Sequence, residues 1–158
     1  MFNFIADSML GSLAKWLRVF GYDVLYEPTW KKEEMINLSL REGRIILTRD
    51  THLINKIGLK VLLIKENGIE KQLRQVVNEL SLKIDKEMIF VRCTICNVLT
   101  NVVPKEEIKD RVPPYVYSTQ NEFRLCPKCN RIYWAGTHLE SVQKMIENLL
   151  LTGRNDEK

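Results

Sequence analysis

Residues 2–27 read FNFIADSMLGSLAKWLRVFGYDVLYE, which predicts a strand, a helix and a second strand in succession. The short apolar run Phe2–Ala6 comes first, and apolar residues at helical spacing then follow along Met9–Phe20. Gly21 interrupts this spacing just before the apolar run Asp23–Tyr26. A glycine suits the left-handed residue that ends a helix, so the stretch predicts one strand-helix-strand unit.

The same alternation continues to residue 84. Strand-like runs recur at Arg44–Thr48 and Lys60–Lys65, each shortly after a glycine, Gly43 or Gly58. Helical spacing is found at residues 30–41, 51–57 and 69–84. Strands that are apolar on both faces are typical of parallel sheets covered by helices on each side. We therefore predict an α/β fold, a three-layer α/β/α sandwich around a mainly parallel sheet.

The composition is that of a globular protein. Of the 158 residues, 45% are hydrophobic and 28% are charged, which excludes disordered and collagen-like chains. No apolar run approaches the ~18 residues of a membrane span, and the first residues lack a signal-peptide pattern. We expect a cytoplasmic protein without a membrane partner. The net charge of +4 is compatible with a polyanionic partner but does not require one.

Two Cys-x-x-Cys pairs mark a second module, which we place at residues 90–158 after a first domain at 1–89. The pairs are Cys93 with Cys96 and Cys126 with Cys129. Four thiolates at this spacing predict a closed, structural Zn²⁺ site, a zinc ribbon. Disulfides are the alternative, disfavoured in the cytoplasm, and a redox motif needs only one pair.

Two further patterns in the second module predict its turns and its last helix. Asn97 and Asn130 each follow a cysteine pair, where a left-handed backbone is often needed. Thr137 and Glu140 predict a capping box that opens a C-terminal helix reaching about Leu151. The sequence therefore predicts two tight metal-binding turns and a final helix.

The predicted ribbon also combines cations with aromatic rings, a mixture that single-stranded RNA favours. Arg124 and Tyr117 are our candidates for RNA contacts there. The alternative is a small core that uses its aromatic residues for packing, and the residues alone leave both open.

Acidic residues stand at the ends of predicted strands. Asp7 follows the first strand and Asp50 follows Arg44–Thr48, so both belong to the carboxyl edge of the sheet, where ligands collect in α/β folds. Converging carboxylates favour a cation between them, and oxygen ligands suit Mg²⁺ or Mn²⁺. Glu27 after the second strand, or Glu33 or Glu34 in the next helix, could add a ligand. We expect a catalytic centre formed by Asp7 and Asp50.

Basic residues near these acids are candidates for contacts with a phosphate backbone. Lys15 and Arg18 follow Asp7 in the first helix, and Arg49 precedes Asp50. A solvated helix face is the alternative interpretation of the first two. Neither histidine, His52 or His138, is expected to act as a catalytic base.

Ordered motifs along the chain resemble those of the Mut-seven C-terminal RNase domain family. They are FIADSMLGSLAKWLRVFGYD at 4–23, ILTRD at 46–50, CTIC at 93–96, CPKC at 126–129 and RIYWAGTH at 131–138. The resemblance implies a PIN-like nuclease fold followed by a zinc ribbon. Under it, Asp7 matches the first-strand acid, Asp50 the acid of a Thr-x-Asp motif, and Glu33 or Glu34 a middle acid.

Two expectations qualify this resemblance. No fourth acid in a matching context follows Asp50, and residues 88–92 could supply a fifth strand. The function expected is a metal-dependent, endonucleolytic ribonuclease whose ribbon helps to bind RNA. The alternatives are a non-catalytic RNA-binding or ribosome-associated module, or a protein-interaction adaptor, because fold alone does not establish chemistry.

Overall fold

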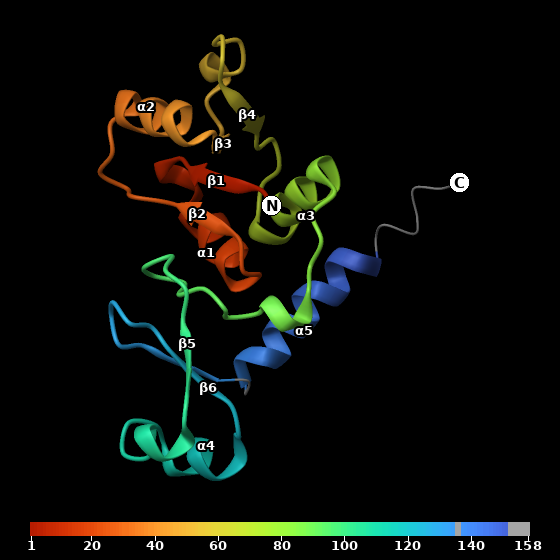
Figure 1. Ribbon diagram of the computed structural model, residues 1–158. Helices are drawn as coiled ribbons and strands as arrows, with labels where there is room; N and C mark the ends of the chain where they lie inside the picture. Colours follow the sequence, from red (N-terminus) through yellow and green to blue (C-terminus); the bar gives the residue numbers. More distant parts are fainter. Residues whose placement is uncertain (135–136, 152–158) are drawn as a thin grey trace.

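Four parallel strands form one sheet in the N-terminal half of the chain (Figure 1). The computed structural model describes residues 1–134 and 137–151, and its description of side chains leaves out residues 137–139. The order in the sheet is β2-β1-β3-β4, and the strands are β1 (Asn3–Ala6), β2 (Asp23–Leu25), β3 (Ile45–Thr48) and β4 (Lys60–Leu63). Each pairing is parallel, and each strand falls within a predicted run.

Helices cover both faces of this sheet. α1 (Gly11–Val19) and α3 (Ile69–Leu80) pack on one face, and α2 (Lys32–Glu42) packs on the other. The strand side chains alternate accordingly, since Phe4 joins the first cluster and Ile5 joins the second. The predicted three-layer α/β/α sandwich is thereby confirmed.

The glycines that precede three of the strands adopt left-handed backbones, as predicted, with φ between 68° and 89°. Gly21 also lies against the chain that leads to the ribbon. A Cβ at Gly21 would stand 2.8 Å from the carbonyl oxygen of Met88. This turn therefore has two independent reasons to hold glycine, its φ of 89° and its close approach to the backbone of Met88.

The segment that joins the two units differs from the prediction. Residues 88–92 form no strand; Asp85 instead caps a short 3-10 helix, η3 (Lys86–Met88). Phe90 then has a φ of 58°, which is incompatible with an extended strand. The predicted helix at 51–57 shortens in the same way to the single turn η2 (Thr51–Leu53).

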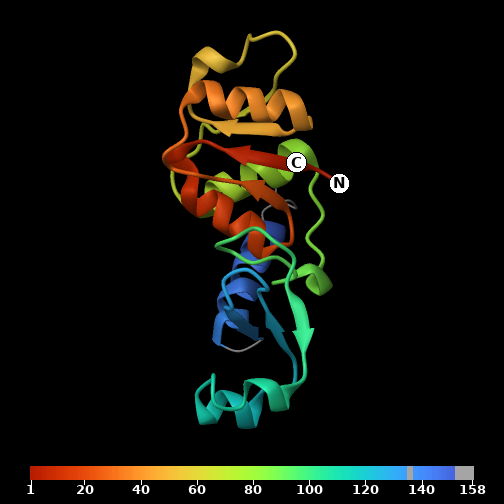
Figure 2. The same cartoon turned by 60° about the vertical axis from the view of Figure 1, so that its left-hand side comes forward.

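The ribbon is a small antiparallel sheet of order β5-β6-β7, formed by β5 (Asn101–Val103), β6 (Phe123–Leu125) and β7 (Ile132–Trp134) (Figure 2). Between β5 and β6 lie η4 (Lys105–Ile108) and α4 (Pro114–Thr119). Their own core is minimal and centres on Ile108, Val112 and Phe123. So small a core suggests that the ribbon depends on its cysteines for stability.

The last helix, α5 (Thr137–Leu151), runs from the ribbon back toward α3 (Figure 1). Its Val142, Ile146 and Leu149 are buried in the same cluster as the residues of α1 and α3. This helix follows the second module in the sequence, and its apolar face packs against helices of the first. The side chains of Thr137, the predicted cap, and of His138 are among those that the structure does not describe. None of the described helices has the length and apolar character that a membrane span requires.

Hydrogen bonds tie the first cysteine turn of the ribbon to edge strand β2. The Asn97 amide accepts from the Val24 N–H at 3.0 Å and donates to the Asp23 carboxylate at 2.7 Å. Arg18 in α1 donates to the carbonyl oxygens of Val24 and Thr94, at 2.9 and 3.0 Å. The ribbon is therefore held against the sandwich by buried polar contacts.

Candidate functional site

Asp7 and Asp50 come together at the carboxyl edge of the sheet because β1 and β3 are neighbours. Ala6 pairs with Leu47, which places Asp7 beside Thr48. The buried Thr48 hydroxyl donates to Asp7 Oδ2 at 2.8 Å and accepts from the Asp50 N–H at 3.0 Å. One side chain thus links the two predicted acids and fixes the orientation of the Asp7 carboxylate.

Each aspartate also caps a short helix with its Oδ1 atom. Asp7 Oδ1 accepts from the Ser8 N–H at 2.6 Å. Asp50 Oδ1 accepts from the His52 N–H at 2.9 Å and lies 2.9 Å from the ring nitrogen His52 Nδ1. Both carboxylates are therefore held by backbone donors at the start of η1 (Ser8–Leu10) and η2.

A positively charged side chain, that of Lys32, lies beside Asp50. The Lys32 ammonium, from the first turn of α2, forms an ion pair with Asp50 Oδ2. This contact, with the donors of His52, holds the pKa of Asp50 well below its usual range. In return the pKa of Lys32 is raised, by Asp50 first and by Asp7 and Glu33 through longer-range attraction. The edge therefore attracts positive charge before any metal is considered.

Glu27 lies in the same cavity as Asp7. Asp7, Glu27 and Lys32 line one cavity of about 200 Å³, whereas Glu33, Glu34 and Asp50 are absent from its described lining, and Asp50 meets the cavity through its ion pair with Lys32. The Glu34 carboxylate accepts from the Lys31 N–H at 2.8 Å at the start of α2, and the Glu27 carboxylate accepts from the Thr29 hydroxyl at 3.1 Å. Glu27 comes two residues after β2 at the same sheet edge, and this position in the sequence indicates that it is a candidate ligand.

Replacing Lys32 by Met is expected to tighten Mn²⁺ binding about two- to fivefold, because a divalent cation no longer has to displace an ammonium from Asp50. The effect is modest since the Lys32 side chain is half exposed and such pairs are screened. Electron paramagnetic resonance of free Mn²⁺ measures the affinity. Lys31→Met, which removes a charge beside the pair, serves as the control. Unchanged or weaker Mn²⁺ binding in Lys32→Met would contradict this view of Lys32.

The four cysteines gather as the spacing predicted. Their sulfur atoms all lie within 4.8 Å of one another, and Cys93 Sγ is 3.7 Å from Cys129 Sγ. Four sulfurs at about 2.3 Å from one Zn²⁺ in a tetrahedron would be about 3.8 Å apart. The residues therefore fit a tetrathiolate metal site. Among the described residues, this is the only group with three or more ligand atoms so closely spaced.

The two cysteine turns share one geometry. Cys96 N–H donates to Cys93 Sγ at 3.3 Å, and Cys129 N–H donates to Cys126 Sγ at 3.4 Å. The asparagine after each pair has a left-handed backbone, with φ of 65° in the first turn and 61° in the second, as predicted. Burial alone would raise the pKa of the Cys93 thiol, but hydrogen bonds from Tyr133 and nearby backbone groups bring it to about 7. Such donors favour a thiolate.

Arg18 does not reach the surface on which we expected RNA. The residue is 6% exposed, and its guanidinium donates to three carbonyl oxygens, those of Val24, Thr94 and Ile95. A guanidinium engaged in this way is not available to a phosphate. Arg18 therefore joins the ribbon to the sandwich, and we leave it out of any RNA surface. Lys15, one turn earlier in α1, is exposed.

The other candidate RNA residues are dispersed. Arg49 donates to the carbonyl oxygen of Glu66 and to Asn67, and Arg124 donates to Thr100 in the ribbon. Tyr117 packs against the small ribbon core, with the Lys105 ammonium 4.7 Å from its ring centre. The structure thus brings together the two aspartates and the four cysteines, but not the five predicted RNA-contacting residues.

Comparison with known proteins assigns the chain to a family. Residues 2–146 match the Mut7-C RNAse domain, so the match includes both aspartates, all four cysteines and most of α5. Searches among curated proteins and among solved structures found no match. Because the family match extends over nearly the whole chain, the protein belongs to the Mut7-C RNAse domain family.

Proposed function

We propose that this protein is a ribonuclease that hydrolyses RNA phosphodiester bonds at the edge where Asp7 and Asp50 meet. The observation that carries the proposal is the Thr48 hydroxyl, which joins the two aspartates in a chain of the Mut7-C RNAse family. The buried Thr48 hydroxyl binds the Asp7 carboxylate and the backbone N–H of Asp50, so it fixes the Asp7 carboxylate beside the start of the Asp50 turn. The fold alone would not support this chemistry.

The residues at this edge fit Mg²⁺ or Mn²⁺. The donors are carboxylate oxygens, which these ions prefer, and Asp50 already pairs with the Lys32 ammonium. We assign the third-acid role to Glu27, which shares the cavity with Asp7, in preference to Glu33 or Glu34. A bound ion would supply a Lewis acid for the phosphate and a lowered pKa for water.

The protein's own side chains would position the reactants. Thr48 and the Ser8 N–H hold the Asp7 carboxylate, and His52 holds that of Asp50. Lys32 offers an ammonium to an RNA phosphate at the same place. Hydrogen bonds hold both carboxylates, so the carboxylates require little reorganisation when RNA arrives, whereas Lys32 would have to leave Asp50 for a metal ion to bind there.

The four-cysteine cluster would hold a structural Zn²⁺, since four thiolates leave no open position for a substrate. We also propose a cytoplasmic location, because a tetrathiolate zinc site requires reduced cysteines.

Two observations favour the second candidate function, a non-catalytic RNA-binding or ribosome-associated module. Lys32 occupies the position of a cation beside Asp50, and the described acids form no cluster of three closely spaced ligand groups. A protein-interaction adaptor is the remaining alternative. The first two hypotheses predict RNA binding, and only the first predicts cleavage.

A circular single-stranded RNA provides the sharpest test of the proposed function, because only an endonuclease can linearise it. Zinc-loaded protein is incubated with this RNA and with a structured RNA, in buffer containing Mg²⁺, Mn²⁺ or no divalent cation. We expect linearisation with Mg²⁺ or Mn²⁺ only. The zinc content is measured in each arm, so that a loss of activity is not confused with a loss of the ribbon.

The ends of the products identify the nucleophile. Attack by water with departure of the 3′ oxygen leaves a 5′-phosphate and a 3′-hydroxyl, whereas attack by the RNA's own 2′-hydroxyl leaves a cyclic phosphate. We expect the first pair of ends. Cleavage without divalent cations, cyclic phosphate products, or no cleavage by zinc-loaded protein would each overturn the proposed function.

A further inference from the structure

A cavity of about 540 Å³ lies where α1, the ribbon strand β7 and α5 meet. Its walls come from both units of the molecule, since α1 belongs to the sandwich and β7 to the ribbon. The residues that define it chemically are Lys15, Trp16, Phe90, Arg131, Tyr133 and Trp134. We refer to this cavity as the α1–ribbon groove.

The groove combines aromatic rings with positive charge. Phe90 and Tyr133 stack with ring centres 5.5 Å apart and an angle of 26° between their planes, and both stay partly exposed. Lys15 and Arg131 are exposed cations, and the described lining contains no carboxylate. Rings that stack with bases and cations that meet phosphates are the two elements of single-strand recognition.

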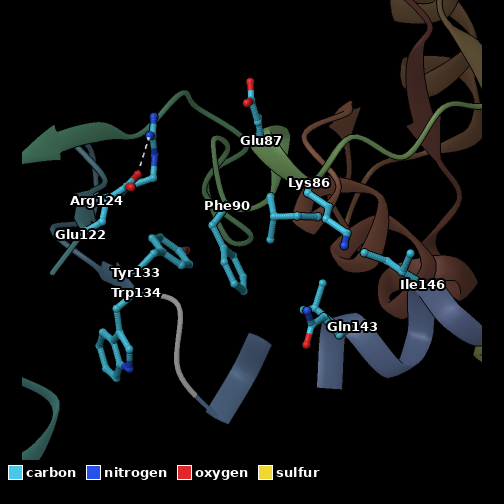
Figure 3. Close-up of a pocket in the computed structure, with 11 residues that line it drawn as sticks. Lys86, Glu87, Phe90, Glu122, Arg124, Tyr133, Trp134, Gln143 and Ile146 are labelled. Carbon is cyan, nitrogen blue, oxygen red and sulfur yellow. Dashed lines mark ion pairs between the residues drawn. The ribbon is translucent and has the colours of Figure 1, made fainter. Parts of the chain in front are cut away.

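A neighbouring cavity helps to identify the ligand class. It has a similar volume and shares Phe90, Tyr133 and Trp134 with the groove, and Figure 3 shows these rings along one side of it. There Arg124 lies beside Glu122, and Glu87 is also part of the lining, so the charges offset one another. The α1–ribbon groove therefore suits a polyanion better than its neighbour does.

The position of the groove relates it to the acidic edge. Ser12, Lys15, Trp16 and Val19 line it from one face of α1, the helix that follows Asp7. α1 begins at Gly11, four residues after Asp7, and Lys15 lies in its second turn. The short segment from Asp7 to Lys15 therefore connects the acidic edge to the groove, and one RNA strand could lie in the groove and reach Asp7.

We infer that the α1–ribbon groove is a nucleobase-binding subsite for single-stranded RNA, with bases against the aromatic rings and phosphates at Lys15 and Arg131. The inference rests on the proposed function, because it takes RNA as the substrate. It also gives the ribbon a role, since the groove exists only when the ribbon is docked against α1.

The test measures RNA binding separately from cleavage. Full-length Asp7→Asn protein, zinc-loaded and without added divalent cations, is titrated into a fluorescein-labelled single-stranded RNA, and anisotropy is recorded from low to moderate salt. Lys15→Ala with Arg131→Ala is then added to this background. The matched control is Lys60→Ala with Lys71→Ala, which removes two exposed lysines elsewhere.

We expect the groove variant to bind at least fivefold more weakly than the control. Two lost phosphate contacts should also reduce the slope of log affinity against log salt by about 1.4, since each contact contributes about 0.7 for single strands. Equal affinity and equal slope in the two double variants would overturn the subsite.

A second measurement tests stacking without changing the protein. RNAs that lack a single base are compared at successive positions, and we expect one or two adjacent positions where the loss weakens binding severalfold. The Trp16→Leu variant removes one of the rings of the groove and should weaken this position dependence. A uniform response to base removal would overturn the stacking role even if Trp16→Leu fails to fold.

The outcomes separate this inference from the proposed function. Groove-dependent binding without any cleavage by wild-type protein would leave the subsite standing and remove the enzyme. Normal cleavage by the wild-type protein, together with control-level RNA binding by the groove variant, would support the proposed function and overturn the subsite. If zinc-loaded protein binds no RNA, the subsite is wrong and the groove becomes a candidate surface for a protein partner.

Discussion

Replacing Asp7 by Asn is expected to lower divalent-metal-dependent RNA cleavage by about a hundredfold or more while leaving the fold intact. An amide keeps the oxygen that accepts from the Ser8 N–H, and Asn caps a helix as well as Asp does. Its NH₂ group can donate to the Thr48 hydroxyl, which presently donates to Asp7, so the hydroxyl proton loses this acceptor. The variant therefore loses the negative charge and one hydrogen-bond acceptor, and losing one charged group at a reaction centre commonly costs a factor of this size.

The matched control is Asp85→Asn. Asp85 caps η3 through the Glu87 N–H at 2.9 Å, as Asp7 caps η1, but it lies in the connection between the two units. The same substitution there should leave cleavage and thermal unfolding unchanged. Initial rates on labelled RNA and circular dichroism provide the two measurements. If Asp7→Asn cleaves at the wild-type rate, the reaction takes place elsewhere or belongs to a contaminating nuclease.

Much of the fold could be predicted from local signals. The four strands alternate with helices, and glycine precedes β2, β3 and β4 closely enough to mark each helix-to-strand turn. The asparagines after the cysteine pairs likewise indicate left-handed turns, which Asn97 and Asn130 adopt. These features depend on a few neighbouring residues, so a sequence pattern can reveal them.

The joint between the units was less predictable because its contacts are long-range. Arg18 lies among polar positions of α1, and a local pattern suggests exposure. Its partners Thr94 and Ile95 follow more than 70 residues later, on the first cysteine turn. The apolar face of α5 similarly signals burial without indicating which unit covers it. Tertiary packing determines both the burial of Arg18 and the unit that covers α5. Local sequence propensities carry no information about such packing.

The acidic site was predicted in part. Asp7 and Asp50 could be placed at one edge because carboxyl ends of parallel strands share an edge, but their link through Thr48 depends on the Ala6–Leu47 register. Strand spacing alone does not give that register. The third acid remained open between Glu27 and the acids of α2, since a helix start attracts carboxylates for its own dipole. Glu34 illustrates this, as its carboxylate caps α2.

Replacing Cys126 by Ser is expected to abolish stoichiometric zinc binding and to unfold the ribbon. The sulfur belongs to the cluster within 4.8 Å, and Cys126 is fully buried. Apparent zinc-binding free energies of about 10–16 kcal/mol in zinc-finger peptides exceed what a core of Ile108, Val112 and Phe123 can supply. Zinc analysis, thermal unfolding and the absorption of Co²⁺-substituted protein measure the loss.

Asn130→Gly is the matched control for the same cysteine turn. Glycine adopts the φ of 61° found at Asn130 without strain, so this variant should keep one zinc ion and the wild-type unfolding temperature. Chelation of zinc from the wild-type protein under reducing conditions should reproduce the effect of Cys126→Ser. If Cys126→Ser retains its zinc and its thermal stability, the four sulfurs do not share one ion.

Loss of the zinc should also release the ribbon from β2, because Asn97 of the first cysteine turn binds Val24 and Asp23. The α1–ribbon groove would then no longer form. Zinc removal should therefore weaken RNA binding as much as Lys15→Ala with Arg131→Ala does.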